Sequence, residues 1–144
     1  VALAHGKAVT FMKPADLLKF YPQSAELKSM STPANKNNPY SSDAGKTKWM
    51  KVVTASGQTI GIIGMEKVET PHGHLINAVC FDEKGENIIK IALIKSSREE
   101  AKELIKLTAN NKWWEKYTAP EKAQNAGGIL LRSVARTKAA LKKQ

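Results

Sequence analysis

The chain is poor in cysteine, in acidic residues and in long apolar runs. Its 144 residues include one cysteine, Cys80, so neither an intramolecular disulfide nor a cysteine-based zinc or iron–sulfur site can form. No apolar run approaches the ~20 residues that cross a bilayer, so we expect no transmembrane segment. Hydrophobic residues nevertheless make up 42% of the chain, which is ordinary for a folded domain.

The shortage of acids leaves the chain strongly basic. Lys and Arg together number 23 against 13 Asp and Glu, which gives a formal net charge of +10. Such a balance favours an anionic partner: nucleic acid, an acidic protein, a lipid surface or a phosphorylated cofactor. Charge alone does not choose among these.

The first residues bear on the compartment. Val1 to Ala4 end in the small-x-small pattern that precedes signal-peptide cleavage, and the chain turns polar at His5. This pattern predicts an exported or periplasmic protein, with residues 1–6 as a signal-peptide remnant or an N-terminal tail. An ordinary apolar N-terminus is the alternative.

The order of local patterns predicts one domain over residues 1–144. A short helix is expected at 14–21 between two prolines, and a long polar loop at 28–46. The final helix is expected over 129–143. Four β-rich runs separated by turn sequences are expected to pair in antiparallel fashion: 47–54, 58–65, 74–81 and 87–95. The predicted fold class is α+β, with an antiparallel sheet of about four or more strands and the N-terminal and C-terminal helices packed on it.

The final helix is basic and contains no acid. Its cations are Arg132, Arg136, Lys138, Lys142 and Lys143. Like charges on one helix repel each other, so we expect this helix to be a docking face for an anionic partner.

Few residues carry a chemical signal. His72 and His74 flank one glycine, but two imidazoles fall short of the four ligands of a closed metal site, so they are weak metal candidates and polar strand-end residues are favoured. Cys80 lies in an apolar run and is expected to be a buried hydrophobe. No Ser-His-Asp or Cys-His pattern occurs, which favours a carrier or accessory protein over a stand-alone enzyme.

The segment before the final helix is the strongest binding candidate. Gly127 and Gly128 precede it directly, and backbone N–H groups at a helix start, with the helix dipole, form an anion site. Arg132 and Ser133 in the first turns add donors, and a flexible turn is the alternative. Trp113, in an aromatic segment upstream, is either a face for a planar ring or part of the core.

The order of these pieces resembles the FMN-binding domain family. The resemblance rests on "ADLLKFYPQSAEL", "GHLINAVCFDEKGENIIKIALIKSSRE" and "AGGILLRSVARTKAAL" and spans Lys7 to Lys142. Members include flavin subunits of the sodium-pumping NADH:quinone reductase and of Rnf complexes, and small exported proteins. The family signature Ser-Gly-Ala-Thr-x-Thr/Ser is degenerate here: Ile129, Leu130 and Leu131 stand in place of its hydroxyl residues.

The resemblance implies an exported protein that carries FMN and takes part in electron transfer. The residues expected at the cofactor are Gly127, Gly128, Arg132, Ser133, His74 and Trp113. Because no threonine stands at the positions that match the family signature, any FMN is expected to be bound non-covalently. Expected partners are an acidic redox protein or a membrane electron-transport complex. A flavin-free accessory or binding module of the same fold is the alternative, and a nucleic-acid-binding protein is a more distant one.

Overall fold

The structure is a computed structural model that describes residues 8–33, 46–98, 102, 105, 106 and 126–141. Its elements in chain order are β1 (Val9–Thr10), the 3₁₀-helix η1 (Pro14–Phe20), β2 (Glu26–Ser29), β3 (Lys46–Val53), β4 (Thr59–Thr70), β5 (Gly73–Asp82), β6 (Ile88–Ser96) and α3 (Ala126–Leu141).

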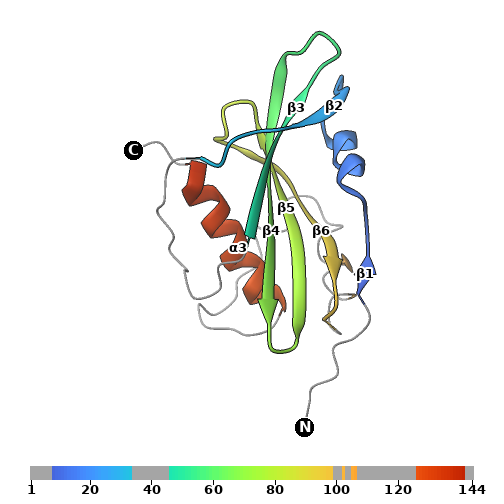
Figure 1. Cartoon of the computed structure of the whole chain (residues 1–144), viewed down its shortest axis with the longest axis vertical. Coiled ribbons are helices and arrows are strands. Elements are labelled where there is room, and N and C mark those ends of the chain that lie inside the picture. The colour runs from blue at the N-terminus through green and yellow to red at the C-terminus, as the bar shows by residue number, and fades with distance from the viewer. Residues whose placement is uncertain (1–7, 34–45, 99–101, 103–104, 107–125, 142–144) are drawn as a thin grey trace.

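The strands form one six-stranded antiparallel sheet in the order β1-β6-β5-β4-β3-β2. Strands β2 to β6 follow each other as a meander, and β1 pairs with β6 at the far edge. The chain passes from the β1 edge to the β2 edge through η1, which contacts both β2 and β6. Figure 1 shows the resulting curved sheet, with α3 along one side and η1 at the other.

Both faces of the central strands are buried, which explains why these runs are apolar rather than alternating. On one face, Val79 and Phe81 of β5 pack with Ile129 and Leu130 of α3. On the opposite face, Cys80 packs in a second cluster with Leu17 of η1 and with residues of β3, β4 and β6. Successive side chains of a strand point to opposite faces, so β5 supplies both clusters.

The predicted α+β fold class, with N-terminal and C-terminal helices packed on about four strands, is wrong. The described chain is mostly sheet: two further strands extend the four expected runs, and the N-terminal segment is a 3₁₀-helix of seven residues. Pro14 starts that segment and Pro22 lies two residues after its end, so the helical stretch is short, as is typical of 3₁₀-helices. Lys28 and Ser29, expected in the polar loop, lie in β2.

Gly61 lets η1 approach the sheet. A Cβ at this position would lie 2.2 Å from the Tyr21 ring. The ring is buried, and its hydroxyl donates a hydrogen bond of 2.7 Å to the Phe81 carbonyl oxygen on β5. Only glycine on β4 therefore leaves room for the tyrosine that anchors the end of η1.

We predict that Gly61→Ala lowers the free energy of unfolding by about 1–3 kcal/mol, the usual cost of overpacking a core. Urea denaturation measures the loss. Tyr21→Leu/Gly61→Ala should lose less than the sum of the two single changes, because the smaller side chain relieves the overlap. Additive losses would contradict the contact.

Candidate functional site

The start of α3 lies in the core rather than at an open site. Gly127 and Gly128 are buried. Ile129 and Leu130 are 1% and 0% exposed within the core cluster between α3 and the sheet, here called the α3-side cluster; the cluster on the opposite face, which contains Leu17 and Cys80, is the η1-side cluster. Leu131 is partly buried against the same cluster. The apolar residues at this helix start therefore serve packing against the sheet.

Ser133 is also directed inward. It is fully buried, and its hydroxyl donates a hydrogen bond of 3.1 Å to Oδ1 of Asn77 on β5. Asn77 is 1% exposed, and its Nδ2 has no hydrogen-bond partner within the described chain. The helix and the sheet thus share a polar contact deep in their interface.

A buried ion pair joins α3 to β4 beside this contact. Nε of Arg136 lies 3.1 Å from both carboxylate oxygens of Glu66, and Nη2 of Arg136 also donates to Oε1. Both side chains are 4% exposed. Thr47 of β3 donates a 3.4 Å hydrogen bond to Oε2 of Glu66. The guanidinium therefore meets the carboxylate in the bidentate geometry that gives strong pairs.

The expected docking face on the final helix is wrong for its arginines. Arg132 and Arg136 are both buried, and the charge of Arg136 is balanced from the sheet by Glu66. Lys138 is exposed, whereas Lys142 and Lys143 lie outside the described residues. The counter-charge of Arg136 therefore comes from β4 and not from the helix itself.

Glu66 and Asn77 are the polar residues that sequence reasoning missed. They lie directly opposite each other in the β4–β5 register. The signal for Glu66 was its position: it alternates with Gly64 and Val68, so the two-residue period of a strand directs it to the face of Val68, which is buried. A carboxylate there needs a cationic partner.

The described residues fit poorly to the FMN phosphate at the start of α3. The phosphate would need N–H and hydroxyl donors facing an open space. Instead Ile129 and Leu130 fill the core, and the Ser133 hydroxyl is bonded to Asn77. Arg132 is buried, and Trp113 lies outside the described residues. Among the described residues, these contacts leave no group to which a step of a flavin mechanism can be assigned.

The two candidate histidines lie at the hairpin between β4 and β5. His72 is exposed in the turn, and its backbone N–H donates to the Thr70 hydroxyl at 3.3 Å. Nδ1 of His74 lies 3.0 Å from the Ser97 hydroxyl. Among the described residues, no group of three or more His, Cys, Asp or Glu is placed to hold a metal ion. The hydrogen bonds of these histidines instead close the end of the sheet.

The end of the hairpin is tied to the end of β6 by further polar contacts. The Ser96 hydroxyl donates to the His74 carbonyl oxygen at 2.7 Å, and the buried Arg98 donates from Nη1 to the Thr70 hydroxyl at 2.8 Å. These contacts therefore hold the ends of β4, β5 and β6 together.

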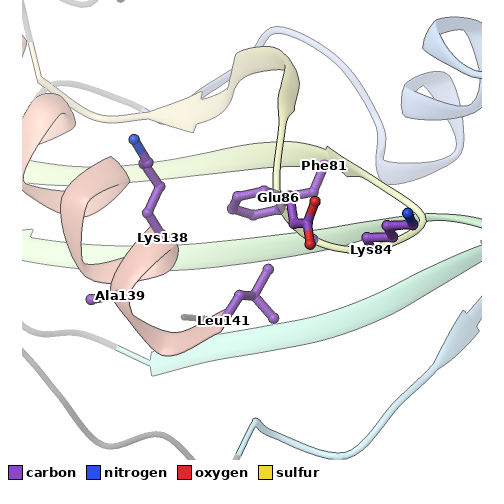
Figure 2. Close-up of a pocket in the computed structure, with 7 residues that line it drawn as sticks. Phe81, Lys84, Glu86, Lys138, Ala139 and Leu141 are labelled. Carbon is purple, nitrogen blue, oxygen red and sulfur yellow. The ribbon is translucent and has the colours of Figure 1, made fainter. Parts of the chain in front are cut away.

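A pocket of about 540 Å³ opens at the other end of α3. Lys138 and Leu141 of the helix line it together with Lys84 and Glu86, and Figure 2 shows Leu141 pointing toward the turn that carries these two residues. The buried Phe81 also lines it. This volume would suit a small ligand, but the rim carries both charge signs on exposed side chains, so it selects no ligand class.

No family model, no curated protein and no solved structure matches the chain. Within the described ranges, no helix is both long enough and apolar enough to cross a membrane.

Cys80 has the environment of an inert core residue. It is fully buried in the η1-side cluster, and burial raises the pKa of its thiol to about 12. The pKa of a thiol in the unfolded chain is ~8.5. Because the folded pKa is higher, the thiol contributes its full stabilisation of the fold at every pH below the unfolded pKa. The contribution is lost as pH rises toward the folded value.

We predict that the native protein does not react with Ellman's reagent at pH 8 and reacts once per chain in urea. The free energy of unfolding should fall between about pH 8.5 and 12, and less steeply in Cys80→Ala, whose unfolded state has no thiol to ionise. Urea denaturation at several pH values measures the slope. Rapid labelling of the folded protein would contradict the burial of Cys80.

Proposed function

We propose that this protein is a flavin-free accessory module that docks an acidic protein partner. The supporting observation is the charge of its surface. In the described chain, exposed lysines clearly outnumber exposed carboxylates. The lysines are Lys13, Lys19, Lys28, Lys46, Lys48, Lys67, Lys84, Lys102, Lys106 and Lys138; the carboxylates are Asp16, Glu26, Glu69, Glu83 and Glu86.

The buried polar groups support a binding role over catalysis. Glu66, Arg136 and Ser133, which combine acid, cation and hydroxyl, are held in mutual or internal bonds within the interface of α3 and the sheet. A catalytic group must reach its substrate, and these side chains face the core. A cationic surface, by contrast, steers an anionic partner into contact without any chemical step.

The redox character of that partner and an exported location follow from the resemblance to the FMN-binding domain family alone. They therefore remain part of the proposal. In such an assembly this chain would supply the docking surface, and the partner would carry the electrons.

We predict that the wild-type chain binds fluorescein-labelled poly-L-glutamate, used as a probe for acidic protein. Raising NaCl from about 0.1 M to about 1 M, which shortens the Debye length from ~10 Å to ~3 Å, should weaken the binding at least about tenfold. Fluorescence anisotropy measures this dependence. Failure to bind at low salt would overturn the docking function.

A second experiment tests whether the protein carries flavin. Protein purified from its native host should show no visible absorption of oxidised flavin and an intact mass equal to that of the polypeptide. A flavin band released on denaturation, or a mass increase equal to esterified FMN, would restore the electron-carrier function and contradict the flavin-free proposal.

A further inference from the structure

Three lysines lie in lateral register on the sheet face opposite α3. Lys46 of β3 pairs with Lys67 of β4, Lys67 pairs with Ile76 of β5, and Ile76 pairs with Lys95 of β6. We refer to Lys46, Lys67 and Lys95 as the lysine row. Neighbouring strands are about 4.8 Å apart, so at the backbone Lys67 lies about 5 Å from Lys46 and about 10 Å from Lys95. Lys48, two residues along β3, lies on the same face.

The lysine row lies beyond the part of this face that η1 covers. Leu17 and Tyr21 at η1 pack with Met50 and Ile63, farther along β3 and β4. Lys46 and Lys67 are exposed, and Lys95 is partly exposed. Met65 and Ile76 are half-buried beside the lysines. The surface therefore combines an apolar centre with a cationic surround, which is the composition of many protein interfaces.

The row is costly to the isolated fold. Like charges directly opposite each other on neighbouring strands are destabilising, and Lys46 is directly opposite Lys67. The carboxylate nearest in register is Glu69, whose Oε1 lies 3.4 Å from Nζ of Lys67. Glu69 is 76% exposed, so it offsets little of the charge. A partner that brings several carboxylates would relieve this repulsion.

The chemistry of the row favours an acidic protein over nucleic acid. Single-stranded nucleic acid is held by aromatic side chains on which bases stack, and the row and its described neighbours in register include no aromatic residue. The cations are lysines, which act as point charges and lack the planar fork with which arginine grips phosphate. Carboxylates one helical turn apart, about 5–6 Å, match the spacing of Lys46 and Lys67.

We infer that the lysine row is the docking surface for an acidic segment of a partner protein, laid across β3, β4, β5 and β6. This inference rests on the proposed docking function and assigns it to one place. The partner would contribute Asp or Glu side chains to the lysines and apolar side chains to Met65 and Ile76.

The test compares two full-length triple variants that lose the same charge. Lys46→Gln/Lys67→Gln/Lys95→Gln removes the row; Lys13→Gln/Lys84→Gln/Lys138→Gln removes three exposed lysines elsewhere. Binding of labelled poly-L-glutamate at low salt should weaken about tenfold or more in the row variant and less than about threefold in the matched control. The row variant should be at least as stable as wild type in urea, because opposed like charges are removed.

Each other outcome overturns a stated part of the proposal. If the two variants weaken equally, binding follows net charge and the row is not the docking surface, while the docking function stands. If the wild type does not bind poly-L-glutamate, the proposed function fails as well. If wild type binds oligo(dT) more tightly than poly-L-glutamate and the row variant loses that binding, the partner is nucleic acid. A row variant that is less stable than the control would show that the row serves the fold.

Discussion

The ion pair between Glu66 on β4 and Arg136 on α3 determines how the helix can lie on the sheet. A buried carboxylate or guanidinium without its partner costs several kcal/mol, so any shift of α3 along its axis would separate two charges in a dry interface. Gly64 allows the close approach, because a Cβ there would lie 2.7 Å from the Thr137 side chain. The hydrogen bond from Ser133 to Asn77 gives the same alignment one helical turn earlier.

This constraint divides the positive charge of the protein into two groups. Arg98, Arg132 and Arg136 are buried, and the fork of Arg136 satisfies a carboxylate inside the fold. The lysines remain largely at the surface, where their charge is available to another molecule. The two buried arginines of α3 therefore add nothing to the exposed part of the net charge of +10, and the exposed row on the opposite sheet face is where we propose that an anionic partner meets several cations together.

The sequence predicted the strands better than the fold class or the site. The apolar runs and the turn sequences around Gly57 and Gly85 placed β3 to β6 and their antiparallel pairing, because β-rich runs and short turns are both local signals. β1 and β2 were not predicted, since strands of two and four residues that are mostly exposed are too short to show a periodic signal. The polar contact between α3 and the sheet was not predicted because it joins residues seventy positions apart. A single sequence cannot show which arginine faces which carboxylate. The helix-start glycines predicted an anion site, yet Ile129 and Leu130 pack against the sheet there, so the start of α3 forms part of the core.

A double-mutant cycle on Glu66 and Arg136 tests most directly whether Arg136 serves the fold through this buried ion pair rather than contributing a charge to the surface. Arg136→Met and Glu66→Leu should each cost about 3–5 kcal/mol in urea denaturation, because each leaves one buried charge alone, while the double variant should cost much less than their sum. Lys138→Gln, an exposed change on the same helix, should stay within about 0.5 kcal/mol. Single variants as mild as Lys138→Gln, or losses that simply add, would contradict a buried, mutually compensating pair.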